Sequence, residues 1–306
     1  MPNRFQFPLD EAYTARVEQS LAEGVRQARQ NLRPARLGAG WGEAEANVNR
    51  RARDASGRVR LGSNPAGPVD RRIGLIRLEK AGGAPLALIA NYPMHGTVLG
   101  GGSTLISGDG PGIVAAYVEQ KIGAPMLYVN GAAGNIAPVY STRPEAEADL
   151  LSRFEVLLGD PILDANRRLA ATTAEVKLRA SRLILETPKR PDLNWPDELK
   201  DYLRVSGDGK ETLLVPLRFL RINDEIVIWS APLELFCEIS NEIRASSPFS
   251  HTFYAGYTNG TFAYLPTEEE FRAGGYEPAT SPFTAAAAGH LIAAVNRHLR
   301  ELHAAQ

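Results

Sequence analysis

The chain has 306 residues, enough to bury a large hydrophobic core in one or two domains. Its 34 basic and 35 acidic side chains nearly cancel, which gives no electrostatic case for nucleic acid or an anionic membrane surface, because both need clustered positive charge. The single cysteine, Cys237, excludes an intramolecular disulfide and a thiolate metal cluster, so a metal ion would need nitrogen and oxygen ligands.

The first part of the chain predicts a helix, a strand and a polar loop. Apolar residues fall at helical spacing from Leu9 to Asn31, ahead of Pro34. Residues 35–43 are typical of a strand that runs into a turn, and their Gly-x-Gly spacing is a weak dinucleotide signal because no helix opens there. The arginine-rich stretch from Asn47 to Asn64 predicts a solvated loop. No apolar run is long enough to span a bilayer, so we expect no transmembrane segment.

The stretch from Asn91 to Thr97 directly follows residues 85–90, an apolar run with the length of a buried strand. This places His95 just past a strand's carboxyl end, which is the edge where α/β proteins bind ligands. For His95 alone two interpretations stay open, a ligand-binding imidazole or a residue that caps a turn. Residues 73–78 and 86–91 predict two neighbouring strands with a short hairpin connection.

Glycine-rich segments follow at residues 100–102 and 107–112, where Asp109 is predicted to cap a helix that starts near Pro111. Because no Gly-Lys-Ser/Thr ending is present, tight turning is favoured over phosphate binding. Another small-residue turn, residues 130–138, follows a short strand at residues 125–129 and lets backbone approach backbone or ligand closely. Its amides form an oxyanion hole in one interpretation, and it is a tight crossover without a ligand in the other.

The second half of the chain continues the alternation of strands and helices. Helices are predicted over residues 145–169 and 283–302, and strands over residues 175–186, 213–222, 225–229 and the start of 251–260. Glu234 is expected in the opening turn of a helix just beyond a strand end, where acidic residues usually serve the helix dipole. Thr267 and Glu270 predict a capping box for a short helix. This alternation favours a layered α/β domain.

Five motifs occur in the order found in the neutral/alkaline ceramidase family, and together they cover nearly the whole chain. They are residues 91–97, 107–112, 130–138, 232–234 and 264–277. The chain resembles this family, most closely its bacterial ceramidase-like members of unassigned substrate. The resemblance implies an α/β fold of layered mixed sheets flanked by helices, like the family's N-terminal domain, with residues 1–306 forming a single catalytic domain.

The resemblance also implies an activity and a cofactor. Family members are zinc-dependent amidases, and zinc-bound water would attack the N-acyl amide of ceramide or of another small-molecule or lipid substrate. The positions that match the metal ligands are His95, Glu234 and Tyr264. Imidazole and carboxylate are ordinary zinc ligands, whereas a phenol ionises near pH ~10 and needs zinc to favour its deprotonated form. Arg50 and Tyr276 match residues that line the reacting amide, and we expect both to hold the carbonyl oxygen.

The family's Gly-Asp-x-Ser-Pro box reads Gly-Asn-Ile-Ala-Pro at residues 134–138. Ala137 thus replaces a serine that has been viewed as a nucleophile or a carbonyl partner, and a methyl group can be neither. We expect Asn135 to take part in catalysis, and we expect the rest of this turn to line the substrate. The predicted substrate-lining residues are Asn130, Gly131, Ala133, Gly134 and Ala137.

Two alternatives remain to zinc-dependent hydrolysis. One is a catalytically impaired homologue that binds a lipid or glycan in the same cleft, and the weaker one is a serine hydrolase, for which the sequence has no Gly-x-Ser-x-Gly elbow. The family's His-x-His-Ser segment, which carries its first metal ligand, has no counterpart here, so we expect the family's amino-terminal portion and its C-terminal sandwich domain to be missing. The first residues lack a signal peptide's apolar core, although family members are often exported.

Overall fold

The structure is a computed structural model that describes residues 10–100, 103–104, 106–140, 149–169 and 171–305. The chain divides into two compact units, residues 1–35 and residues 36–306. The first unit contains helix α1, Glu11–Gln30, whose N-cap Asp10 accepts a hydrogen bond from the amide of Tyr13. The helix predicted ahead of Pro34 is therefore confirmed.

The larger unit alternates strands and helices, as predicted. Its strands are β1 (Ala35–Glu43), β2 (Asn47–Arg53), β3 (Val59–Asn64), β4 (Arg72–Lys80), β5 (Pro85–Tyr92), β6 (Met126–Asn130), β7 (Ile136–Pro138), β8 (Leu178–Pro188), β9 (Leu203–Val205), β10 (Glu211–Ile222), β11 (Ile226–Ser230), β12 (Glu234–Leu235), β13 (His251–Ala255) and β14 (Tyr264–Leu265). Its α-helices are α2 (Asp109–Ile122), α3 (Asp149–Phe154), α4 (Asp160–Arg168), α5 (Cys237–Ser246), α6 (Glu268–Ala273), α7 (Tyr276–Thr280) and α8 (Ala287–Ala304), with a π-helical turn at Glu155–Gly159 and a 3₁₀ turn at Asp197–Tyr202.

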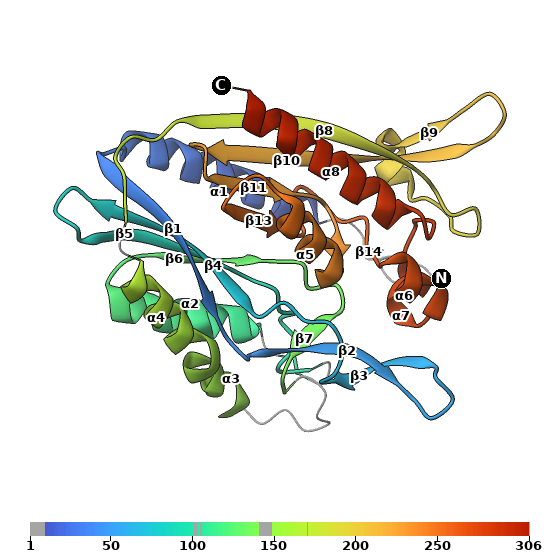
Figure 1. Cartoon of the computed structure of the whole chain (residues 1–306), viewed down its shortest axis with the longest axis horizontal. Coiled ribbons are helices and arrows are strands. Elements are labelled where there is room, and N and C mark those ends of the chain that lie inside the picture. The colour runs from blue at the N-terminus through green and yellow to red at the C-terminus, as the bar shows by residue number, and fades with distance from the viewer. Residues whose placement is uncertain (1–9, 101–102, 105, 141–148, 170, 306) are drawn as a thin grey trace. The chain divides into compact units, whose positions relative to one another are not determined.

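Two main sheets pack face to face, and helices cover their outer faces (Figure 1). One sheet has the order β1-β4-β5-β6, and the other has the order β13-β11-β10-β8 with β9 beside β10. The first packs on α2 and α4, and the second packs on α5 and α8. Ile76 and Ile89 of the first sheet meet Ile226 and Phe253 of the second in the apolar layer between the sheets. This arrangement confirms the predicted α/β class of layered mixed sheets flanked by helices.

Each main sheet contains one parallel pair of strands, and the two pairs end close together. β5 runs parallel to β6, and β11 runs parallel to β13. The amide of Gly256, directly after β13, donates to the carbonyl of Asn130 at the end of β6. The carboxyl ends of the two pairs therefore meet at one place, which is where ligands bind in many α/β proteins. No helix in the described residues is both long enough and apolar enough to cross a bilayer.

The prediction of a solvated loop from Asn47 to Asn64 was wrong, because this stretch forms the antiparallel hairpin of β2 and β3. Arg51 is only 2% exposed, and its guanidinium donates to the carboxylates of Glu270 and Glu277 and to the carbonyl of Gly274. Charged side chains can be buried when they are paired and hydrogen-bonded. The partners of this arginine come from α6 and α7, more than 200 positions later in the chain.

The structure also changes the predicted context of Glu234. Instead of opening a helix, this residue begins the two-residue strand β12, which pairs in parallel with β14, and the helix α5 starts only at Cys237. In that register Glu234 lies directly opposite Tyr264. The predicted antiparallel pairing of residues 73–78 with residues 86–91 is confirmed by β4 and β5.

Asp109 is the first residue of α2 rather than its cap. Its buried carboxylate accepts hydrogen bonds from the amides of Val98, Leu99 and Gly110, so it ties the loop after His95 to the start of the helix. Of the glycine loop predicted at residues 100–102, positions 101 and 102 lie outside the described residues. The helix predicted over residues 145–169 is described from residue 149 onward and contains the π-helical turn.

The turn between β6 and β7 passes against the strand that carries Glu234. The amide of Gly134 donates to the carbonyl of Leu235 at 2.8 Å, and a Cβ atom on Gly134 would lie 2.5 Å from the carbonyl oxygen of Glu234. Only glycine permits such a close approach of two backbones. The tight-crossover interpretation of this turn therefore has a structural basis.

We predict that Gly134→Ala destabilises the fold by about 2–4 kcal/mol, because backbone rather than a flexible side chain occupies the required space. Gly112→Ala is the matched control, since nothing lies within 4 Å of its added Cβ in α2 and alanine is the better helix former by about 1 kcal/mol. Denaturant unfolding of both variants measures the difference. Equal stability of the two variants would contradict this account of the turn.

Candidate active site

Three predicted ligand residues, His95, Glu234 and Tyr264, come together at the shared end of the two sheets. His95 follows β5, Glu234 lies in β12, and Tyr264 lies in β14. The Nε2 atom of His95 is 3.1 Å from the Oε2 atom of Glu234, and the rings of His95 and Tyr264 stack with centroids 6.5 Å apart. These three residues span 170 positions in sequence, and the fold brings them to one point.

A hydrogen bond at Nδ1 holds the ring of His95 in one orientation. Nδ1 lies 2.8 Å from the carbonyl oxygen of Ile136, which only accepts hydrogen bonds, so Nδ1 carries a hydrogen. In the neutral ring Nε2 then presents a lone pair toward the carboxylate of Glu234. Two acceptors at this separation repel each other unless a proton or a metal ion lies between them. A backbone carbonyl behind a histidine is also the usual support of a metal-binding imidazole.

Glu234 and Tyr264 complete the cluster that they form with His95, and their pKa values depend on their neighbours. Burial raises the pKa of Glu234, but its contacts with His95 and Tyr264 and the positive charge of Arg50 outweigh burial, so the pKa lies below its ordinary value. Burial raises the pKa of the Tyr264 phenol above 10, and the nearby Arg50 opposes this shift. The carboxylate is therefore ionised, whereas the phenol needs additional positive charge to ionise near neutral pH.

Arg50 is brought to the cluster by β2. Its guanidinium lies 5.3 Å from the centroid of the Tyr264 ring, and its Nε donates to Glu277 at 2.9 Å. The arginine is 9% exposed, and its Nη2 has no hydrogen-bond partner in the structure as described. Buried donors are rarely left unpaired. The free Nη2 hydrogens are thus available to an oxygen atom of a ligand.

Two further tyrosines border the cluster. Tyr276, which the sequence predicted, is 41% exposed and meets the Tyr264 ring edge-on with centroids 5.6 Å apart. Tyr257 was missed by the sequence analysis, although it follows β13 at the same strand end. Its hydroxyl lies 3.4 Å from the Oε2 atom of Glu234, and its ring meets His95 edge-on. Burial and the charge of Glu234 raise the pKa of the Tyr257 phenol.

Asn135, predicted to be catalytic, lies beneath the cluster and is fully buried. Its Oδ1 accepts the amide of Cys237 at 3.0 Å, its Nδ2 donates to Glu238 at 2.7 Å, and its carbonyl accepts the amide of Arg50 at 2.8 Å. The side-chain amide is therefore engaged by α5, and the backbone helps to place the arginine. These contacts favour a positioning role.

The predicted substrate-lining residues lie in the segment from the end of β6 to β7 and pack against other protein groups. Asn130 accepts a hydrogen bond from the amide of Met94 at 3.1 Å, and an added Cβ on Gly131 would contact Pro93. Ala133 and Ala137 are 1% and 3% exposed. Their substrate contact stays a prediction, and the packing shown here is between protein groups.

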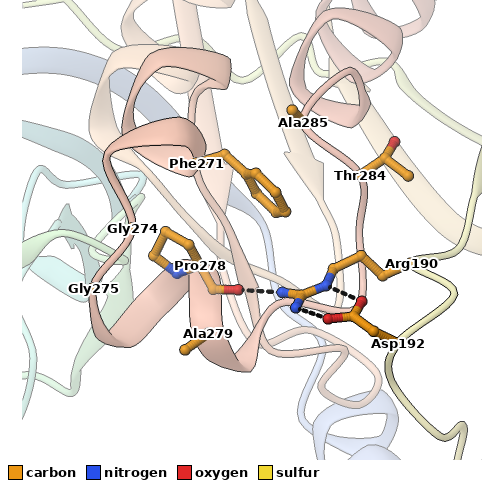
Figure 2. A pocket seen from close by; sticks show the side chains of 9 residues that line it. All are labelled: Arg190, Asp192, Phe271, Gly274, Gly275, Pro278, Ala279, Thr284 and Ala285. Carbon is orange, nitrogen blue, oxygen red and sulfur yellow. Dashed lines mark hydrogen bonds and ion pairs between the residues drawn. The ribbon is translucent and has the colours of Figure 1, made fainter.

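A separate surface cavity of about 520 Å³ lies on the other side of the segment that carries Tyr276. Figure 2 shows the side chain of Arg190 bridging from Asp192 to the carbonyl of Pro278, with Phe271 nearby. This arginine also approaches the carbonyl of Ser281 at 3.3 Å. The cavity contains none of the clustered residues, and its arginine braces α7 from outside.

The fold of this chain is similar to that of two ceramidases of known structure. The structure of neutral ceramidase from Pseudomonas aeruginosa matches 93% of this chain and 55% of its own length, with 20% identity and a TM-score of 0.68. A ceramidase complexed with C2 matches with 18% identity and a TM-score of 0.67, over 93% of this chain and 57% of its own. No protein-family model and no curated protein matches the chain.

The predicted resemblance is thereby confirmed at the level of the fold, since an identity near 20% shows the fold alone. The chain spans about half the length of the two ceramidase structures that it matches. The activity and substrate of those enzymes are therefore matters of proposal for this chain.

We predict that Asn135→Asp destabilises the protein by about 2–3 kcal/mol at pH 8, because a second carboxylate would replace the amide that now donates to Glu238. Burial already raises the pKa of Glu238, and a carboxylate neighbour raises it further. The folded state of the variant then binds more protons than the unfolded state, so its stability falls as pH rises through the folded pKa.

The measurement is denaturant unfolding at pH 5 and pH 8, with the exposed Asn194→Asp as the matched control. The deficit of Asn135→Asp should be smaller at pH 5, and the control should show little change at either pH. A deficit that does not depend on pH would argue against a carboxylate pair.

Proposed function

We propose that this chain is a zinc-dependent amidohydrolase that cleaves an N-acyl amide, with a ceramide-like lipid as the leading substrate class. The proposal is supported most directly by the 3.1 Å approach of the His95 Nε2 atom to the Glu234 Oε2 atom, since a proton or a metal ion must lie between two such atoms. The ceramidase fold supplies the second argument. Nearly the whole chain, 93% of it, matches about half of the length of the Pseudomonas aeruginosa enzyme.

The donor set fits a zinc ion. Zinc lies about 2.0–2.2 Å from nitrogen and oxygen ligands in tetrahedral geometry, which puts neighbouring ligand atoms about 3.3 Å apart. The observed 3.1 Å separation agrees with this value. No three His, Cys, Asp or Glu side chains meet within the described residues, so the third ligand from this chain would be the phenol of Tyr264. Zinc polarises a carbonyl group and makes water a nucleophile near neutral pH when it is bound.

Arg50 and Tyr276 would donate hydrogen bonds to the carbonyl oxygen of the substrate amide. Arg50 offers its unpartnered Nη2 to the carbonyl oxygen, where negative charge develops as the carbonyl carbon becomes tetrahedral. Tyr276 also contacts the Tyr264 ring and is exposed, and in this proposal its hydroxyl donates to the same oxygen. Glu277 fixes Arg50 from behind through the Nε hydrogen bond. Donors held in place before the reaction need no reorganisation during it.

Ala137 favours water over a protein nucleophile. It lies in β7 with 3% exposure and pairs with Val48 of β2. Since the methyl group can neither attack nor donate, hydrolysis would depend on water. The same observation supports the second candidate, a catalytically impaired homologue that binds a lipid or glycan, and turnover measurements separate the two.

We predict that purified protein supplied with zinc holds about one zinc per chain, and that His95→Ala loses it because one of the two closest ligand atoms is removed. His290→Ala is the matched control, since that histidine is exposed on α8 and pairs with Thr187. Elemental analysis measures zinc, and hydrolysis is followed on a panel of N-acyl amides with and without chelator. An unaltered zinc content in His95→Ala, or no turnover of any amide at any metal loading, would overturn the proposal.

We predict that Arg50→Lys lowers kcat by about 100-fold, because lysine cannot keep the Glu277 contact and still present a donor at the Nη2 position. KM should change little if the oxygen gains most of its charge in the transition state. Arg53→Lys, which removes a more exposed guanidinium on the same strand, is the control. A loss of zinc from Arg50→Lys would show instead that the arginine supports the metal site through Tyr264.

A further inference from the structure

Tyr257 differs from every other residue of the cluster in its backbone. Its φ is 55°, in the left-handed region that bulky side chains rarely adopt, and Asn259 and Ala263 follow with φ of 62° and 61°. Backbone strain persists where the surrounding structure enforces it, and it gathers at functional sites. The strained backbone of Tyr257 and the contact of its hydroxyl with Glu234 therefore indicate a functional role for this residue.

The loop that carries Tyr257 is held firmly by backbone hydrogen bonds. The amide of Gly256 donates to Asn130 at 3.0 Å, that of Thr258 donates to Ala231 at 3.1 Å, and that of Phe262 donates to Pro232 at 2.7 Å. The amide of Tyr257 itself lies 3.4 Å from the carbonyl oxygen of Leu233. These hydrogen bonds hold the backbone before and after Tyr257 in place.

The side chain lies over the solvent side of the cluster. It is 38% exposed, whereas Tyr264 is 7% exposed, and its ring stands perpendicular to that of His95. The hydroxyl must be the donor in its 3.4 Å contact, because the Glu234 carboxylate only accepts. That distance is long for an O–H···O hydrogen bond, so the contact is weak and easily exchanged for a ligand.

The donors of the cluster contact different members of it. Arg50 and Tyr276 both contact Tyr264 and serve the carbonyl oxygen in the proposed function. Tyr257 contacts His95 and Glu234 instead. An amide bound with its oxygen toward Arg50 therefore has its nitrogen free to face Tyr257.

We propose that Tyr257 is a further catalytic residue, whose hydroxyl leaves Glu234 and donates a hydrogen bond to the amide nitrogen as the C–N bond breaks. This inference rests on the proposed function. The oxygen of water bonds to the carbonyl carbon, the C–N electron pair stays on nitrogen, and nitrogen takes its proton from that water. The phenol keeps its own proton throughout.

The role has a kinetic signature. The nitrogen of a planar amide has no free lone pair, and it becomes an acceptor only once the carbon is tetrahedral. The hydrogen bond then forms in the transition state and not in the bound substrate, so its loss lowers kcat and leaves KM nearly unchanged. The loss should also matter more for a poor leaving group than for a good one.

The test compares Tyr257→Phe with wild type, both loaded with zinc. Tyr202→Phe is the matched control, since its ring packs on Phe262 of the same loop. The substrates are N-octanoyl butylamine, whose leaving group is poor, and N-octanoyl 4-nitroaniline, whose leaving group is good. We expect Tyr257→Phe to lower kcat by about 10- to 100-fold on the alkyl amide and by at most about threefold on the anilide. Zinc content and melting temperature should be unchanged.

Each other result has a distinct meaning. Equal kcat for wild type and Tyr257→Phe on the alkyl amide overturns this inference and leaves the proposed function standing. The same loss on both amides also overturns it, because a merely structural effect does not depend on the leaving group. Loss of zinc from Tyr257→Phe would assign the hydroxyl to the metal site and overturn it as well. Absence of turnover by zinc-loaded wild type defeats the proposed function itself, and this inference with it.

Discussion

The site depends on one enforced contact, in which an imidazole nitrogen and a carboxylate oxygen are held 3.1 Å apart. The Ile136 carbonyl fixes the hydrogen of His95 on the far nitrogen, and the pairing of β12 with β14 fixes the strand that carries Glu234. Gly134 lets the intervening turn pass against that strand. The Ile136 contact restrains the imidazole, the strand pairing places the backbone of Glu234, and the two side-chain atoms together favour positive charge between them.

A network of buried ion pairs holds Arg50 beside Tyr264. Glu277 is 1% exposed and joins Arg50 at 2.9 Å to Arg51 at 2.5 Å, and Glu270 binds the other side of Arg51. Buried ion pairs of this kind contribute little net stability, but removing one partner leaves an unpaired buried charge. The network therefore fixes geometry more than it adds stability. It couples the β2–β3 hairpin to α6 and α7, so that Arg50 and Tyr276 both contact Tyr264.

The alternation of strands and helices was sufficient for the layered α/β class, whereas the three residues that converge were indicated together only by the resemblance to the ceramidase family. The sequence was misleading for residues 47–64, since arginines on a strand look solvated until their partners on α6 and α7 are known. Glu234 was misplaced for the same reason: its strand has two residues and exists only through its pairing with β14. Tyr257 carries no local signal, because its importance comes from a backbone conformation and a contact with Glu234.

The altered box at residues 134–138 is consistent with an intact site. An aspartate at position 135, as in the ceramidase box, would face the carboxylate of Glu238, whereas Asn135 donates to that carboxylate and accepts from the amide of Cys237. The neutral amide and the buried glutamate thus form a satisfied pair. A decaying site would leave such groups without partners. Among the described residues of the site, Nη2 of Arg50 is an unpartnered buried donor, and the proposed function uses it for a substrate oxygen.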